Sequence, residues 1–320
     1  MKKLILLVTC IIIVNVLSGQ ERYFDERYIS SMSFLNPVLV NPGATGFDKE
    51  HHVLLNYRNE WASFPGSAKS IILSYDGPIA DRLGFGGMLI SDSNGSLETT
   101  KLQGSLAYTL DTPSNVLGFG LSAEFIQHGL SGDVIGGPII DITDPKVLDR
   151  IDGTNFFDVS FGVQGIYNGL LSYGLSLPSL VSSRIDDNPS TADREIGFIF
   201  NVGYKFDKLD SGISLEPSLW VKKLMNVPFH ADINILGRFL DDRLRGGLNY
   251  RVGADEKLGF LIGFGVNTLN FTYAYNASRH EYQQYSNGSH ELSVRFDIGK
   301  VMKNDGTVVD DVMDDKMMQN

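Results

Sequence analysis

The stretch LQGSLAYTL, residues 102–110, alternates between apolar and polar side chains. One face would carry Leu102, Leu106, Tyr108 and Leu110, and the other Gln103, Ser105 and Thr109. In a β-strand successive side chains point to opposite faces, so a two-residue period predicts a strand that separates two different environments.

The same alternation recurs in separate runs from about residue 52 to residue 298, and each run is followed by residues typical of turns. Fourteen runs are predicted, beginning near residues 52, 69, 83, 98, 117, 156, 170, 195, 213, 230, 244, 258, 269 and 290. Connections after even-numbered runs are short, whereas those after odd-numbered runs are mostly longer, including residues 128–155 and 178–194. An even strand number with short turns at one end and long loops at the other is typical of bacterial outer-membrane barrels.

A soluble β-sandwich or barrel also alternates, with its apolar face turned inward. Fourteen strands, however, would enclose an interior too wide for apolar side chains to fill. The polar faces carry glycines, serines and charges of both signs, which suit a wet lumen, and Tyr and Phe gather at the ends of the runs as interfacial girdles do. We therefore expect an all-β transmembrane outer-membrane β-barrel of about 14 antiparallel strands over residues 51–298.

Residues 1–19 have the layout of a secretory signal peptide, because Lys2 and Lys3 precede a short apolar run that ends in small residues. An uncleaved anchor is the alternative, but the apolar run is short for a membrane span. Lipid attachment at Cys10 is a further alternative, which the bulky Thr9 before it disfavours. Cleavage would remove the only cysteine, so no disulfide is expected.

The mature chain would be acidic. Removing Lys2 and Lys3 from 27 basic residues leaves 25 against 38 acidic ones, a net charge of −13. This balance argues against nucleic acid as a partner, since nucleic-acid binding requires basic patches. Residues 20–50 are expected to form an N-terminal periplasmic segment. Residues 299–320 are expected to form an acidic, disordered tail that meets periplasmic partners.

The stretch LGFGGMLISD, residues 83–92, resembles a glycine-rich nucleotide-binding motif. That motif places its glycines between a strand and a helix, and here no helix follows. We therefore interpret Gly84, Gly86 and Gly87 as residues that relieve crowding on the lumen face.

Two pairs of adjacent residues, His51-His52 and His290-Glu291, could ligate a metal. Neither has the i, i+4 spacing of a helical site, and each lies at a strand start, so we interpret them as polar strand ends. The four loop acids Asp141, Asp144, Asp149 and Asp152 could bind calcium weakly, but their spacing does not match an EF-hand loop. No cofactor, metal or catalytic set is expected, and the chain is not expected to be an enzyme.

Four segments, in order, resemble a known family. They are FLNPVLVNPGATGF at residues 34–47, the cluster and two turns from Tyr57 to Pro78, the glycine-containing run from Leu83 to Gly95, and HELSVRF at residues 290–296. Together they resemble the PorP/SprF family of type IX secretion outer-membrane proteins, found in gliding or secreting Bacteroidetes. The chain departs from the family pattern in reading NPGATG where NPAYAG is usual, and in continuing through residues 299–320.

The resemblance gives a set of candidate residues at the barrel rim and in the family motifs. These are Asn41, Pro42, Tyr57, Arg58, Asn59, Glu60, Trp61, Pro65, Gly66, Asp76, Pro78, His290 and Glu291.

The cluster YRNEW, residues 57–61, is interpreted as rim architecture rather than as an active site. Tyr57 and Arg58 would end the first strand, and residues 59–68 would form its outer loop. Trp61 would lie near the membrane interface, where an amphipathic ring is stable. Arg58 and Glu60 fall on the same side by alternation and are expected to pair across the lumen mouth.

The resemblance implies an outer-membrane component of type IX secretion or gliding machinery that helps to export or anchor large surface adhesins. The expected partners are outer-membrane lipid, a secreted adhesin with a C-terminal sorting domain, and periplasmic components of the machinery. We expect docking by the rim and the long loops rather than chemistry. The alternative is a porin or a transporter of hydrophobic substrates, since fourteen strands also suit such barrels.

Overall fold

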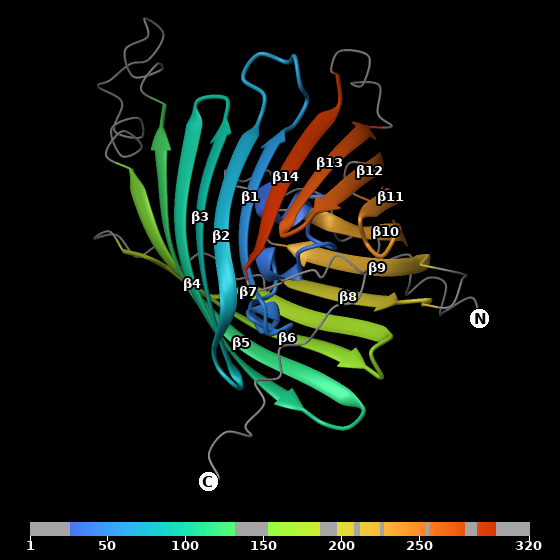
Figure 1. Ribbon diagram of the computed structural model, residues 1–320. Helices are drawn as coiled ribbons and strands as arrows, with labels where there is room; N and C mark the ends of the chain where they lie inside the picture. Colours follow the sequence, from blue (N-terminus) through green and yellow to red (C-terminus); the bar gives the residue numbers. More distant parts are fainter. Residues whose placement is uncertain are drawn as a thin grey trace, which may run out of the picture.

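The computed structural model describes residues 26–131, 153–185, 197–207, 212–224, 227–253, 256–278 and 287–298. In these ranges fourteen antiparallel strands form a closed barrel, each paired with its neighbours in chain order, and β1 pairs with β14 (Figure 1). The predicted outer-membrane β-barrel of about 14 strands is confirmed.

The strands lie close to their predicted positions, and every start lies within three residues of the prediction. Their bounds are β1 His51–Asn59, β2 Lys69–Ala80, β3 Leu83–Asn94, β4 Leu97–Asp111, β5 Asn115–Leu130, β6 Thr154–Tyr167 and β7 Leu171–Arg184. The second half comprises β8 Phe198–Tyr204, β9 Ser214–Leu224, β10 Val227–Phe239, β11 Leu244–Gly253, β12 Lys257–Val266, β13 Leu269–Ser278 and β14 Ser289–Ile298.

The wall of the barrel is apolar outside and polar inside, the reverse of a soluble barrel. On β4, Leu102 and Leu106 are 61% and 57% exposed, whereas Lys101 and Gln103 between them are 2% and 8% exposed. The apolar side chains therefore point outward and the polar ones into the lumen. This arrangement matches a bilayer outside and a polar interior inside, as in outer-membrane barrels.

The longest strands project beyond the apolar band. A membrane-crossing strand needs roughly 9–11 residues, whereas β4 has 15 and β5 has 16. At the end of the barrel that carries the long connections, the outward side chains of these strands change from apolar to polar, with Glu98, Thr100 and Gln127 exposed. The wall around β4 and β5 thus extends past the bilayer on the extracellular side, which we call the outer end.

Two prolines predicted in connections lie inside strands instead. Pro78 belongs to β2, which continues to Ala80, and the pairing register with β3 shifts between these two residues. Pro178 belongs to β7 and lies next to Ser179, which has φ 52°, where the register with β6 shifts. Proline cannot donate to the hydrogen-bond ladder, so it is accommodated at such irregular positions.

The long connections are shorter than predicted, because β5 reaches Leu130, β6 begins at Thr154 and β7 reaches Arg184. The predicted signal peptide, most of the two longest loops with their four aspartates, and the tail at residues 299–320 lie outside the described residues. At the opposite end of the barrel the turns are short, and we call this the periplasmic end.

Candidate functional site

The chain that precedes the barrel lies inside it. Residues 26–50, the lumen segment, form three short 3-10 helices, η1 Glu26–Ile29, η2 Pro37–Leu39 and η3 Pro42–Ala44, which Figure 1 shows in blue within the wall. No helix of the described part of the chain is both long and apolar enough to cross a membrane. Sequence reasoning placed residues 20–50 in the periplasm, whereas residues 26–50 fill part of the lumen.

The first residues of the lumen segment are held by buried polar contacts to strands on opposite sides of the barrel. Arg27 donates to Glu124 of β5 at 2.8 Å. The backbone carbonyl of Tyr28 accepts from Lys222 of β9 at 2.8 Å. Glu291 of β14 accepts from the backbone N–H of Ser31 at 3.0 Å. Because these partners are buried, the contacts are shielded from water and fix the segment across the lumen.

The Asn-Pro motif of the family has a structural role in this segment. Asn41 caps η3 by accepting from the backbone N–H of Gly43 at 2.9 Å. Its amide also donates to the carbonyl of Val163 at 2.9 Å and to Oε1 of Gln164 at 3.1 Å, both on β6. Pro42 supplies the first residue of η3, where a missing N–H costs nothing. The motif therefore fixes the segment to the wall.

Glycines on the lumen face leave room for the backbone of the segment. A Cβ on Gly84 would lie 2.2 Å from the carbonyl oxygen of Thr45, and one on Gly120 would lie 2.1 Å from that of Pro42. The interpretation of Gly84 as relieving crowding thus agrees with the structure. Gly87 differs, since it has the parity of the outward residues and nothing lies within 4 Å of its Cβ position.

We expect Gly120→Val to loosen the lumen segment and to destabilise the barrel by about 1–3 kcal/mol, the usual cost of overpacking. The new side chain would collide with the Pro42 backbone, which cannot rotate away. The free energy of unfolding in urea, followed by the gel mobility of the folded barrel, measures the effect. Gly104→Val is the matched control, because nothing lies within 4 Å of its Cβ position, and equal losses in both variants would contradict the explanation.

At the outer end, Arg58 and Glu60 pair as the alternation indicated, at 2.5 Å and almost fully buried. Lys257 of β12, three strands from β1 along the wall, also bonds Glu60 and so links two parts of the rim. Burial alone would raise the pKa of Glu60, but the adjacent Arg58 and Lys257 lower it to about 2. The stabilisation from this carboxylate is therefore present above its ordinary pKa of 4.5 and is lost as the pH falls toward 2.

A second buried ionic group lies deeper in the lumen. Asp232 of β10 accepts from Arg251 of β11 at 2.6 Å and lies 3.0 Å from Lys222 of β9. Arg251 also donates to the backbone carbonyl of Ile29 at 3.2 Å, so the group contacts the lumen segment. Asp232 is thus a counter-ion shared by two buried cations.

At the periplasmic end, His52 joins the segment to the barrel seam. Its ring nitrogens lie 2.7 Å from Asp48 and 2.8 Å from Asp297 of β14. Burial would raise the pKa of Asp48, but the hydrogen bond and charge of His52 lower it. Asp48, Glu50 and His52 also group their side-chain ligand atoms within 4.8 Å of one another. Both ring nitrogens of His52 already face the carboxylates of Asp48 and Asp297. These three residues therefore fit an ionic triad better than a metal site.

The remaining motif residues of the first hairpin lie at the outer rim. Tyr57 and Trp61 are 40% and 41% exposed on the outside of the barrel. Asn59 ends β1 and accepts from the hydroxyl of Ser67 at 3.0 Å. Pro65 and Gly66 belong to the exposed outer loop, and these positions suit contact with lipid headgroups or a partner.

Three further motif residues lie on β2 and β14. Asp76 points into the lumen and accepts from the backbone N–H of Gly46 at 3.1 Å. Glu291 also faces the lumen, whereas His290 faces outward and contacts the hydroxyl of Tyr273 at 2.6 Å. The family motifs thus divide between residues that hold the lumen segment and residues that form the rim.

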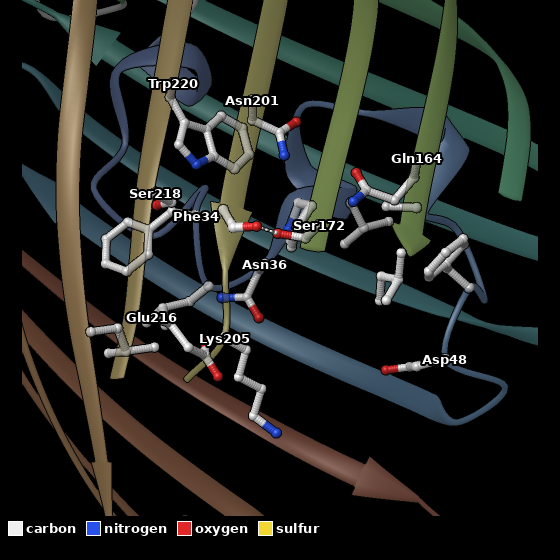
Figure 2. A pocket seen from close by; sticks show the side chains of 18 of the residues that line it. Phe34, Asn36, Asp48, Gln164, Ser172, Asn201, Lys205, Glu216, Ser218 and Trp220 are labelled. Atoms are coloured by element: carbon white, nitrogen blue, oxygen red, sulfur yellow. Dashed lines mark hydrogen bonds between the residues drawn. The ribbon is translucent and has the colours of Figure 1, made fainter. Parts of the chain in front are cut away.

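A cavity of about 380 Å³ lies between the lumen segment and the strands β6 to β10, and residues of β1, β2 and β14 complete its lining (Figure 2). It reaches the periplasmic end, because Gly169 and Lys205 in or beside the short turns belong to its lining. Phe34 and Trp220 form apolar parts of its wall, and Asn201 is a polar part. This space was not evident from the sequence, since its lining comes from the lumen segment and several strands.

A closed antiparallel barrel with an apolar outer band and a polar lumen defines an outer-membrane β-barrel protein. The family described as "Type IX secretion system membrane protein PorP/SprF" matches residues 23–296, and the chain belongs to this family.

Comparison with curated proteins gives no match. Among solved structures, the CymD monoaromatic hydrocarbon channel has 11% identity and a TM-score of 0.48, covering 87% of this chain and 93% of that chain. The toluene transporter TbuX of Ralstonia pickettii has 12% identity and a TM-score of 0.48, with 87% and 95% covered. A FadL homologue of Pseudomonas aeruginosa has 12% identity and a TM-score of 0.47, with 80% and 92% covered.

Proposed function

We propose that this PorP/SprF protein is a non-enzymatic component of the type IX secretion or gliding machinery that helps to export or anchor a large surface adhesin. In this proposal the barrel binds the C-terminal sorting domain of the adhesin at its outer end and meets the periplasmic machinery at the other end. Family membership supports the association with secretion, and the structure supports docking over passage.

The filled lumen is the observation that carries the proposal. The lumen segment is bound to β5, β6, β9 and β14 through buried polar contacts. Removing one partner of a buried hydrogen bond costs its full desolvation, so displacing the whole segment is costly. With the segment bound in its lumen, the barrel is suited to presenting a rigid outer surface. It is not suited to passing a folded or extended adhesin through the interior.

The outer end offers a surface that a large partner can use. The walls of β4 and β5 extend past the apolar band with polar outward side chains. The buried Arg58, Glu60 and Lys257 group holds the first outer loop to β12, three strands from β1 along the wall. Rigid elements of this kind position a binding surface more accurately than loops alone.

The alternative function, transport of a small hydrophobic substrate, has one structural observation in its favour, the cavity at the periplasmic end. That cavity contains several charged and amide side chains, including Asp48, Asn201 and Arg238, which oppose the binding of a purely apolar molecule. Docking therefore accounts for more of the observed features.

Deletion of residues 132–152, the main part of the longest outer loop, tests the docking proposal. We expect surface display of the partner adhesin, measured by antibody binding to intact cells, to fall to near background while the adhesin accumulates inside. The amount of folded barrel in the same cells is followed by gel mobility. Unchanged display with a folded barrel would remove the loop from the mechanism.

A further inference from the structure

An asparagine amide lines the cavity. Asn201 of β8 is 5% exposed and lines the cavity. Among the described residues, no side chain or backbone group forms a hydrogen bond with its amide. Gly174 of β7 leaves space for this side chain, since a Cβ there would lie 2.5 Å from Asn201 Oδ1. The amide is open to the cavity, so either a bound ligand or water can complete its hydrogen bonds.

Three further donors face the same space. Asn36 and Gln164 each use their side-chain oxygen, as acceptors from Arg295 and Asn41, and leave their amide N–H groups without a partner in the described part of the chain. Figure 2 shows Asn36, Gln164 and Asn201 around one space with the Trp220 indole beside it. The indole N–H likewise has no hydrogen-bond partner among the described residues. The cavity therefore offers a surplus of neutral donors to a ligand rich in acceptor oxygens.

The charged groups of the cavity lining each have a partner, within the lining or beside it. Lys205 and Arg295 pair with Asp207 and Asp297 at 2.9 Å, and Asp76 accepts from the backbone N–H of Gly46 at 3.1 Å. Arg238 bonds Glu216 at 2.9 Å and Asp242 at 2.9 Å. Asp48 bonds His52 at 2.7 Å. A charged ligand would have to compete with these pairs, whereas a neutral one would use the free amides.

Shape favours a compact ring over an extended chain. A cavity of about 380 Å³ lies at the small end of the range for small-molecule sites. The closed wall has no strand edge inside the barrel to which a peptide could add by backbone pairing. Phe34 and Trp220 are among the aromatic residues of the lining, and aromatic rings suit the C–H face of a sugar.

We propose that this cavity is a binding site for a neutral saccharide of one or two rings that carries carbonyl acceptors, such as an N-acetylated amino sugar, and that enters from the periplasmic end. The amide N–H groups of Asn36, Gln164 and Asn201 donate to its oxygens, and the Trp220 indole packs against a ring. This site is independent of adhesin docking at the outer end.

The chain contains only two tryptophans, Trp61 in the outer loop and Trp220 in the cavity. The variant Trp61→Phe therefore leaves one fluorescent reporter at the site. The full mature barrel carrying this change, in detergent, is titrated separately with N-acetylglucosamine, with its β-1,4-linked disaccharide, with cellobiose as an unacetylated disaccharide, and with blocked tri-alanine as a peptide.

We expect a saturable change in Trp220 fluorescence with the N-acetylated sugars and a weaker response to cellobiose. Asn201→Leu, which keeps the shape of the side chain, should weaken the affinity by roughly three- to tenfold, as the loss of one neutral hydrogen bond does. Asn249→Leu is the matched control. Asn249 is a buried lumen amide that bonds Asn234 and does not line the cavity, so its loss should leave the affinity unchanged.

Three outcomes would overturn the proposal: no saturable response to any sugar, a response to tri-alanine alone, or equal loss of affinity in the Asn201 and Asn249 variants. The titration of the Trp61→Phe protein decides the first two even if neither asparagine variant folds. Adhesin display is a separate readout, so failure of saccharide binding would leave the docking proposal standing.

Discussion

Deletion of residues 26–46 should convert a poorly conducting barrel into an open channel in planar lipid bilayers. The deletion removes the part of the lumen segment that crosses the interior, and it leaves residues 47–50 to lead into β1. Barrels somewhat wider than this one have water-filled channels, so we expect single-channel conductance to rise by at least about tenfold.

Deletion of residues 299–320 is the control, because it removes a comparable length of chain after the last strand. It should leave the conductance unchanged. Equal conductance of the intact protein and the variant lacking residues 26–46 would show that the segment does not close the lumen. That result would favour the transporter alternative over docking.

Asp232→Asn is expected to destabilise the barrel by about 3–5 kcal/mol, the cost of leaving buried charge without its partner. Asp232 is 4% exposed and is the carboxylate that faces both Lys222 and Arg251. The variant keeps the size of the side chain but removes its charge, so the two cations would repel each other in a poorly solvated site. The free energy of unfolding in urea measures the loss.

The control for this substitution is Asp111→Asn. Asp111 pairs with Lys49 at 2.7 Å, but both side chains are about half exposed. Exposed ion pairs of this kind contribute about 0–1 kcal/mol to the free energy of unfolding. A loss of similar size in both variants would mean that the Asp232 group is solvated and not a determinant of stability.

The strands could be predicted because each one separates lipid from a polar lumen. On β14, for example, Leu292 and Phe296 alternate with buried Ser293 and Asp297, and the sequence records that contrast at every second residue. The alternation also indicated that Arg58 and Glu60 share a face. Gly87 was wrongly assigned to the lumen face together with Gly86. Adjacent residues of a strand point to opposite faces, so Gly87 faces outward.

The lumen segment could not be predicted in the same way. It has no repeating period, since it consists of 3-10 turns around Asn-Pro pairs, and its polar residues resemble those of an exposed linker. Its partners are distant in sequence, as Arg27 and Glu124 are 97 positions apart. The same holds for the cavity, whose amides at residues 36, 164 and 201 meet only when the barrel is closed around the segment.

The seam between β1 and β14 has a consequence for assembly. The residues that line this seam also hold the segment: Asn56 and Ser31 share Glu291, and His52 links Asp48 to Asp297. The segment precedes β1 in the chain, yet it lies within a wall that β14 completes. We therefore expect closure of the barrel and packing of its interior to be coupled, because the segment before β1 shares its buried partners with the last strand.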